Sequence, residues 1–261
     1  MKDGSLVVVG LGISIAAHAT FEAKHNIREA DQVLFLSYWP ETAGWLSQLN
    51  PNTIDLTDLY AVGKKRSETY RQVVDRILAY VRQGKKVCAV FYGHPGVFVW
   101  PSHEAIWQAR DEGYEAMMLP GISAEDCLFA DLGFDPAHNG CQSYEATDFL
   151  VRPRVFDTST ALILWQIGVI GHMTPAEQGM STPNLDVLLS RLLPAYGEDH
   201  IVYVYEAARY PNEKSLIQKA PLRYLHNAHI TVLSTLYVPG KVSPEVDHNM
   251  VAQLGLTMDD L

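Results

Sequence analysis

The stretch Lys86-Val87-Cys88-Ala89-Val90-Phe91-Tyr92-Gly93-His94-Pro95-Gly96 joins an apolar run of strand length to a loop with two glycines and a proline. An apolar run bounded in this way is typical of a strand buried on both faces. In open α/β sheets, ligands bind beyond the carboxyl ends of such strands. Gly93 and Gly96 let the backbone approach a ligand closely, and Tyr92 places a phenol at the strand's end. The stretch therefore predicts a parallel α/β sheet with a binding loop.

Strand and helix patterns alternate on both sides of this stretch. The predicted strands cover residues 5–9, 32–36, 53–56, 86–91 and 115–119. The predicted helices cover residues 17–30, 42–49, 67–83, 102–111 and 123–130. Strands that alternate with helices through short loops favour an α/β fold with a mainly parallel sheet. We expect this first lobe, with the catalytic loops, to span residues 1–132.

The second half of the chain has longer loops and fewer clear elements. Residues 133–148 are rich in Gly, Pro, Asn and Asp and predict a connection between lobes. Strands are expected at 161–166, 201–206 and 230–237, with a helix at 184–193. We expect a second α/β lobe at residues 133–240. The tail, residues 241–261, has helical spacing late on and is expected to pack on this lobe.

Composition narrows the class of protein. The chain has 261 residues, of which 48% are hydrophobic and 19% charged, which excludes a disordered chain. No apolar stretch is long enough to span a membrane and no secretory signal is visible, so a cytoplasmic protein is expected. Acidic residues outnumber basic ones by 30 to 20, which argues against nucleic acid as the main ligand. The three cysteines and ten histidines show no metal-binding spacing, so we expect no metal site.

Two further loops could carry chemistry. Gly10-Leu11-Gly12 begins like a dinucleotide fingerprint, but Ile15 stands where the third glycine is required, which favours a tight turn. In the run from Leu119 to Asp126, Ser123 suits a helix N-cap with Asp126 completing a capping box. The free N–H groups of that helix are expected to face the same cleft as the Gly93–Gly96 loop. His94 could act as a base, although a lone loop histidine more often only donates or accepts a hydrogen bond.

A basic segment breaks a local rule of helix formation. Cations crowd residues 64–66 at the start of a predicted helix, where the macrodipole disfavours them. Arg66 and Tyr70 are four residues apart and share a face. With Tyr60 they could form a cluster of two phenols and a guanidinium. A solvated basic turn is the alternative.

At these loops the chain resembles the tetrapyrrole methylase superfamily of S-adenosylmethionine-dependent methyltransferases. The motifs are Val9-Gly10-Leu11-Gly12, Thr20-Phe21-Glu22-Ala23, Ala30-Asp31-Gln32-Val33, Gly93-His94-Pro95 and Pro120-Gly121-Ile122-Ser123. The resemblance covers about residues 5–240.

Longer runs resemble one subgroup, the borosin peptide α-N-methyltransferases. They are residues 91–99, residues 119–132, Tyr144-Glu145-Ala146 and Asp148-Phe149-Leu150. Fungal members carry their substrate peptide after a helical clasp at their own C-terminus. Here only 22 residues follow Pro239, so the chain looks like a split enzyme that acts on a separate precursor peptide.

The resemblance implies a reaction and a site. Members methylate backbone amide nitrogens with S-adenosylmethionine, and the resemblance gives catalytic roles to Tyr60, Arg66, Tyr70 and Tyr92. Arg66 would tune the phenols, and either Tyr70 or Tyr92 would donate a hydrogen bond or take the proton. The implied cofactor contacts of the first lobe are Tyr92, Gly93, His94, Pro95, Val97, Phe98, Ser123 and Ala124. Those of the second lobe are Gln166, Tyr205, Ala207, Ser234 and Thr235. A homodimer that binds two precursor chains is expected.

Three alternatives stay open at this point. A tetrapyrrole-precursor methyltransferase of the same fold would not need the cluster of Tyr60, Arg66 and Tyr70. A ribosomal RNA methyltransferase is disfavoured by the formal charge of −10. A binding module without activity is disfavoured because Tyr92 and Arg66 are retained.

Overall fold

A computed structural model describes residues 3–37, 39–61, 63–172 and 184–260, which fall into two compact units. The first unit consists of Met1–Phe134, Gly171–Met180 and Glu206–Leu216. The second consists of Asp135–Ile170, Ser181–Tyr205 and Ile217–Leu261. The first unit thus includes segments from the second half of the sequence.

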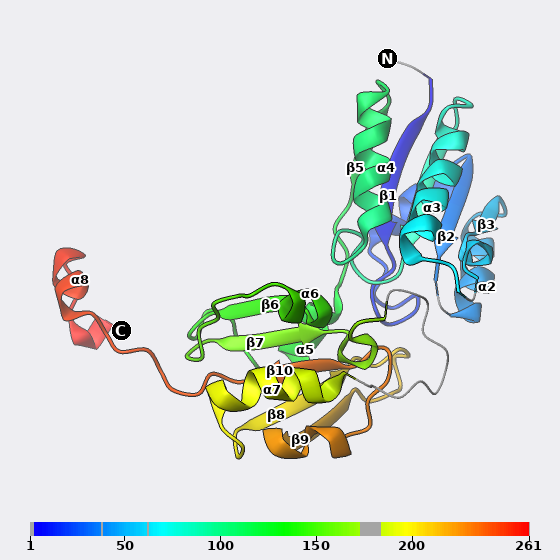
Figure 1. Cartoon of the computed structure of the whole chain (residues 1–261). Coiled ribbons are helices and arrows are strands. Elements are labelled where there is room, and N and C mark those ends of the chain that lie inside the picture. The colour runs from blue at the N-terminus through cyan, green and yellow to red at the C-terminus, as the bar shows by residue number, and fades with distance from the viewer. Residues whose placement is uncertain (1–2, 38, 62, 173–183, 261) are drawn as a thin grey trace. The chain divides into compact units, whose positions relative to one another are not determined.

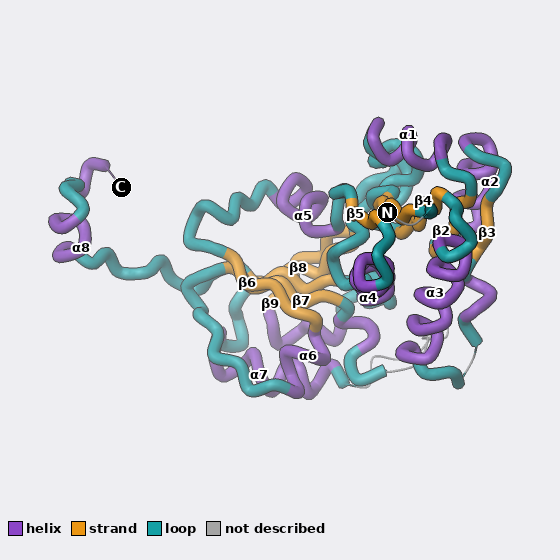
Figure 2. Tube along the Cα trace, turned by 90° about the horizontal axis from the view of Figure 1, so that it is seen from above, coloured by secondary structure: helices purple, strands orange, loops and turns teal. Residues whose placement is uncertain are grey.

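The first unit is a parallel sheet between two layers of helices (Figures 1 and 2). Its strands are β1 (Ser5–Gly10), β2 (Gln32–Leu36), β3 (Thr53–Asp55), β4 (Lys86–Phe91) and β5 (Glu115–Met118). Its helices are α1 (Phe21–Glu29), α2 (Pro40–Leu49), α3 (Arg66–Val81), α4 (Trp100–Asp111) and α5 (Ala124–Leu132). Seen from above, α1 and α2 cover one face of the sheet, and α3 and α4 cover the other (Figure 2). The mainly parallel sheet predicted from the sequence is confirmed.

The strand order β3-β2-β4-β1-β5 determines which loops become neighbours. β1 lies between β4 and β5 and is parallel to both, with Gly10 opposite Phe91 and Val8 opposite Met118. The loops that follow β1, β4 and β5 therefore leave the same edge of the sheet. The helix predicted at 67–83 is observed as α3, and its apolar side chains, such as Val73 and Ile77, are buried against the sheet.

Asn50, at the C-terminus of α2, joins three segments by side-chain hydrogen bonds. Its Nδ2 donates to the carbonyls of Ile27 and Ala30, both at 2.8 Å, and its Oδ1 accepts from the N–H of Asn52 at 2.9 Å. The residue is only 4% exposed. These bonds satisfy two carbonyls at the end of α1, of which that of Ile27 is buried.

We expect Asn50→Ala to lower the free energy of unfolding by about 1–3 kcal/mol, because buried carbonyls lose their donor. Urea denaturation followed by circular dichroism measures the change. The control is Asn26→Ala, whose exposed Nδ2 donates to the Glu22 carbonyl within the same helix, and it should change stability by less than about 0.5 kcal/mol. Equal effects of the two substitutions would contradict the role of Asn50.

The second unit contains a mixed sheet of order β6-β7-β10-β8-β9. Its strands are β6 (Cys141–Glu145), β7 (Ala161–Trp165), β8 (Ile201–Glu206), β9 (Leu216–Pro221) and β10 (Thr235–Val238). β6 and β7 are parallel, whereas β10 is antiparallel to β7 and β8. The helices α6 (Ala146–Val151) and α7 (Leu185–Tyr196) share one apolar core with the sheet. The expectation of a second α/β lobe is confirmed.

Three details of the second half differ from the sequence prediction. Residues 133–148 are more than a connection, because they contain β6 and the start of α6. β9 was not predicted, and residues 230–237 contribute a strand only from Thr235. The tail helix α8 (His248–Gln253) does not pack as expected, since Met250 is 49% and Leu254 66% exposed. A helix of six residues has too few apolar side chains to hold a docked position.

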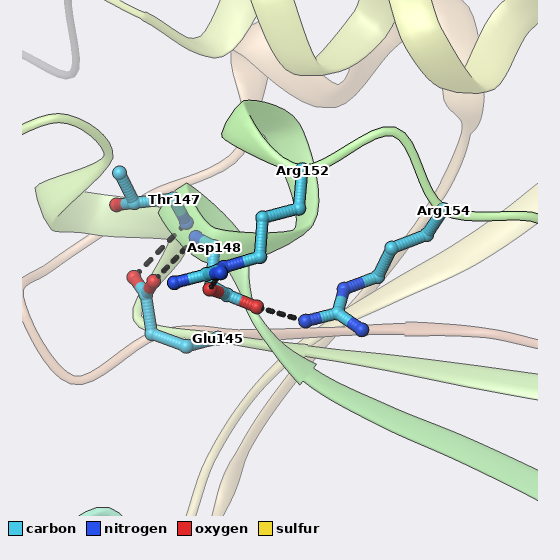
Figure 3. A network of polar contacts seen from close by, with 5 residues as sticks. All are labelled: Glu145, Thr147, Asp148, Arg152 and Arg154. Carbon is cyan, nitrogen blue, oxygen red and sulfur yellow. Dashed lines mark hydrogen bonds and ion pairs between the residues drawn. The ribbon is translucent and has the colours of Figure 1, made fainter.

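Side-chain caps explain why a helix begins directly after β6 (Figure 3). The Glu145 carboxylate accepts hydrogen bonds from the N–H groups of Thr147 at 3.0 Å and Asp148 at 2.7 Å. Arg152 and Arg154 both pair with Asp148, and their hydrogen bonds hold the pKa of this carboxyl below its usual value. The runs Tyr144-Glu145-Ala146 and Asp148-Phe149-Leu150 therefore contain the residues that cap the start of α6.

Candidate functional site

The candidate site is built where the loops after β1, β4 and β5 meet. The N–H of Gly93 donates to the carbonyl of Gly12 at 3.0 Å, and the N–H of Gly12 donates back to Gly93 at 3.2 Å. This isolated bridge joins the loops beyond the two strands. The predicted turn Gly10-Leu11-Gly12 is thus hydrogen-bonded to the beginning of the Gly93–Gly96 loop.

The glycines at this junction are required by close backbone contact. A Cβ atom on Gly10 would lie 2.2 Å from the carbonyl oxygen of Gly93 and 2.7 Å from Cδ of Pro95. A Cβ atom on Gly121 would lie 3.2 Å from the same oxygen and 3.3 Å from the Cα of Gly10. Three loops therefore approach each other through main chain alone, which brings their remaining peptide groups to one place.

The loop after β4 is braced by side chains. His94 Nδ1 accepts a hydrogen bond from the N–H of Gly96 at 2.9 Å, and His103 Nε2 lies 2.9 Å from the carbonyl oxygen of Gly96. The Ser102 hydroxyl donates to the carbonyl of Val99 at 2.7 Å. Within this braced loop, Val97 and Phe98 are 37% and 51% exposed. His94 thus stabilises the loop, and the two apolar side chains are available to a ligand.

The predicted capping box at the start of α5 is confirmed. The Ser123 hydroxyl accepts from the N–H of Asp126 at 3.2 Å, and Asp126 Oδ2 accepts from the N–H of Ser123 at 2.7 Å. Ser123 is 7% exposed, and Ala124 is the first residue of the helix. The cap fixes how the chain enters α5 after Gly121.

Tyr92 follows β4 directly and lies in a mixed apolar and charged environment. Its ring meets the ring of Trp39 edge to face, with centroids 6.2 Å apart. Burial raises the pKa of the Tyr92 phenol to about 12, aided by Cys127 and Glu206 and opposed by Arg209. The phenol is therefore protonated at neutral pH and can donate a hydrogen bond.

The other three predicted catalytic residues lie around the start of α3. Tyr60 ends a short 3-10 helix at Thr57–Leu59, and Arg66 is the first residue of α3. Tyr70 lies one turn later, with its ring stacked on Trp100 at a centroid distance of 6.4 Å. Among the described residues, the charged groups that act on Tyr92 are Glu206 and Arg209, and Arg66 is not among them.

Sequence reasoning missed Trp39, Trp100 and Arg209. Trp39 lies between β2 and α2, and Trp100 is the first residue of α4, directly after the loop that follows β4. Functional side chains gather at this carboxyl edge of parallel sheets. That position was the available signal. No sequence signal pointed to Arg209, because it is 117 residues from Tyr92 along the chain.

Four residues predicted as cofactor contacts lie in the second unit. Gln166 follows β7 with a left-handed backbone at φ 61°, and the N–H of the next residue, Ile167, donates to the carbonyl of Ser234 at 3.1 Å. Thr235 pairs with Tyr205 in the sheet. The structure thus brings Gln166, Ser234, Thr235 and Tyr205 to one edge of the second sheet. Ala207 belongs to the first unit.

Neither a metal site nor a membrane span is found in the described ranges. No group of three His, Cys, Asp or Glu side chains there is placed to hold a metal ion. No described helix is both long and apolar enough to cross a bilayer.

Comparisons with known proteins agree with this architecture. The family model described as Tetrapyrrole (Corrin/Porphyrin) Methylases matches residues 5–223. A methyltransferase/ribosomally synthesized type III borosin cyclic peptide precursor from Anomoporia bombycina is 44% identical over an alignment of 260 positions that covers 98% of this chain. A methyltransferase/ribosomally synthesized cyclic peptide gymnopeptides precursor from Gymnopus fusipes is 42% identical over an alignment of 263 positions that covers 99% of this chain.

The chain spans 30% of the length of the first of these relatives and 63% of the second. Among solved structures, uroporphyrin-III-C-methyltransferase from Thermus thermophilus matches with a TM-score of 0.67 and 18% identity. That match covers 99% of this chain and 100% of the other, and it shows a shared fold.

Proposed function

Because the chain belongs to the tetrapyrrole methylase family, we propose that it is an S-adenosylmethionine-dependent methyltransferase and that its substrate is a peptide whose backbone amides it N-methylates. The observation that carries the peptide substrate is the identity of 42–44%, over nearly the whole chain, to two proteins named as methyltransferase/ribosomally synthesized cyclic peptide precursors. Tyr92 directly after β4, and Tyr60 and Tyr70 on either side of the start of α3, supply the phenols that such a reaction would use.

The residues at the loop junction fit the proposed cofactor. Gly10, Gly93 and Gly121 leave no side chain between the loops, so peptide groups can face a bound nucleoside. The exposed Val97 and Phe98 offer apolar surface for its base. The residues proposed to hold it in the first unit are Tyr92, Gly93, His94, Pro95, Val97, Phe98, Ser123, Ala124 and Ala207. Gln166, Tyr205, Ser234 and Thr235 are the proposed contacts from the second unit. The cofactor, when bound, supplies an electrophilic methyl group.

The chain's own task in the reaction is to make an amide nitrogen reactive. The nitrogen lone pair is delocalised into the carbonyl, so the amide needs help at both ends. A protonated phenol at Tyr92 can donate a hydrogen bond to the substrate carbonyl oxygen and stabilise the charge that develops there. We assign this role to Tyr92 because it directly follows β4 beside the glycine junction, and its phenol, with a pKa raised to about 12, keeps its proton at neutral pH. Tyr60 and Tyr70, near Arg66, are then the candidates for taking the amide proton.

Intact mass spectrometry tests the function directly. The protein is incubated with S-adenosylmethionine and a candidate precursor peptide added as a separate chain. We expect mass steps of about 14 Da, the mass of a methylene, and fragmentation should place them on backbone nitrogens. Methylation of a tetrapyrrole precursor or of RNA, with none on any peptide, would overturn the proposal.

The proposed mode of action, with a separate precursor and a homodimeric enzyme, is tested in the same samples. Steps on the added peptide support action on a separate chain, whereas steps only on the enzyme's own chain contradict it. Light scattering of the enzyme alone and with the peptide measures the subunit number, and a monomer in both samples contradicts the dimer.

A further inference from the structure

Residues 206–216, here called the strap, are held against the first unit by several contacts. The carbonyl of Arg209 accepts a hydrogen bond from the N–H of Ile15 at 3.0 Å. The Tyr210 hydroxyl is hydrogen-bonded to Glu41 at the start of α2. The Ser215 hydroxyl accepts from the N–H of Ala208 at 3.1 Å and donates to Asp131 at the end of α5. The strap backbone is therefore anchored on both sides of Arg209.

The anchored strap places the Arg209 guanidinium over the ring of Trp39. The guanidinium carbon lies 4.5 Å from the Trp39 ring centroid, and the same ring meets Tyr92 at 6.2 Å with an interplanar angle of 74°. A planar guanidinium over an aromatic face keeps its charge while making a stacking contact that lysine cannot copy. Arg209 thus lies over the face of Trp39, and Trp39 in turn meets the ring of Tyr92 edge to face.

We infer that Arg209 is a positioning residue that acts on Tyr92 from the face of Trp39 and supplies positive potential to the phenol during methyl transfer. The effect of Arg209 on methyl transfer rests on the proposed function. Its electrostatic effect on the Tyr92 phenol does not depend on that function. The charged and titratable groups that face Tyr92 are Glu206, Cys127 and Arg209. Arg209 is the only cation among these three, and it opposes the effects of burial and of the Glu206 carboxylate on the phenol's pKa.

Positive potential near this phenol has a defined use. A phenol that donates to a developing oxyanion becomes a better donor as its proton is held less tightly. Without the guanidinium, burial and Glu206 would raise the pKa of the Tyr92 phenol further. The phenol would then hold its proton more tightly, and its hydrogen bond to the reacting carbonyl would weaken. The contact with the Trp39 ring keeps the cation in place.

The test measures the ionisation of Tyr92 without any substrate. The enzyme is labelled with 3-fluorotyrosine, and the ¹⁹F signal of residue 92 is assigned by its absence in Tyr92→Phe. In Arg209→Gln the titration midpoint should rise by about one pH unit, the lower end of the range for loss of a nearby opposite charge. Arg209→Lys should give a smaller rise because it keeps the charge and loses the stack. The control, Arg71→Gln, removes a guanidinium that donates to the Ser67 carbonyl on the exposed side of α3, and it should leave the midpoint unchanged.

Activity and a second variant complete the test. With peptide substrate, Arg209→Gln should lower kcat about tenfold with little change in KM, because the effect is confined to the reacting groups. If Arg209 variants do not fold, Trp39→Phe, which weakens the cation–π contact, should shift the midpoint in the same direction. An unchanged midpoint in both Arg209→Gln and Trp39→Phe overturns the inference. A shifted midpoint in an enzyme that methylates no peptide overturns the proposed substrate and supports the electrostatic effect of Arg209 on Tyr92.

Discussion

Tyr92→Phe is expected to lower the rate of peptide methylation by about 10²–10³-fold, the usual loss when one donor to a developing oxyanion is removed. The substitution deletes only the hydroxyl and keeps the ring that meets Trp39. Single-turnover kinetics followed by mass spectrometry measures the rate, and thermal unfolding should stay within a few degrees of the wild type. A large fall in rate with a normal fold would mark Tyr92 as part of the chemistry.

The matched control for this prediction is Tyr203→Phe, which removes a hydroxyl from β8 in the second unit. Its ring also packs on an aromatic neighbour, Tyr237, at 5.8 Å. We expect nearly unchanged activity. Full activity in Tyr92→Phe, or an equal loss in both variants, would contradict the role assigned to Tyr92.

The pH profile separates a donor from a base at this position. A phenol whose pKa is raised to about 12 stays protonated throughout the neutral range, so its ability to donate should not change between pH 6 and pH 9. If Tyr92 instead had to lose its proton before the reaction, the rate would rise about tenfold per pH unit over that range. The log of kcat/KM against pH for the wild type and Tyr92→Phe distinguishes the two: a tenfold rise per unit that disappears in the variant contradicts the donor role.

Gly10→Ala is expected to abolish activity and to lower the free energy of unfolding by about 3 kcal/mol or more. The new methyl group would lie 2.2 Å from the carbonyl oxygen of Gly93, and main chain on both sides cannot move without separating the loops. Urea denaturation measures stability, and equilibrium dialysis with labelled S-adenosylmethionine measures cofactor binding at the loop junction.

Gly44→Ala is the control for the effect of a glycine substitution as such. Gly44 lies at an exposed position of α2, and a Cβ atom there meets nothing within 4 Å. Alanine in a helix interior is favoured over glycine by about 1 kcal/mol, so this variant should be more stable than the wild type and fully active. A Gly10→Ala enzyme with normal stability and cofactor binding would show that the junction tolerates a side chain.

The sequence predicted the first lobe closely because its elements depend on local pattern. β2 and β4 begin and end where their apolar runs do, and α3 buries the stripe that its spacing indicates. Buried parallel strands carry continuous apolar runs, so the signal is strong. The capping box of Ser123 and Asp126 was equally readable, since both partners lie within one turn.

The second lobe was harder to predict for a physical reason. β6 and β9 carry polar and half-exposed side chains, as in the sequences Cys141-Gln142-Ser143-Tyr144-Glu145 and Leu216-Ile217-Gln218-Lys219-Ala220-Pro221. They are the outer strands of their sheet, and an outer strand needs little apolar character. Its place is decided by pairing with a neighbour, which local sequence does not reveal.

The sequence by itself determined the parallel α/β lobe, the glycine-rich loops and the family motifs, because each depends on residues within one element or turn. The tertiary structure alone decided what surrounds the phenol at residue 92. Arg209 reaches Trp39, whose ring meets Tyr92, only because the strap folds back onto the first unit from a distant part of the chain. Burial and the potential of neighbouring charges depend on distance in space, and these two quantities set the proton affinity of the tyrosine.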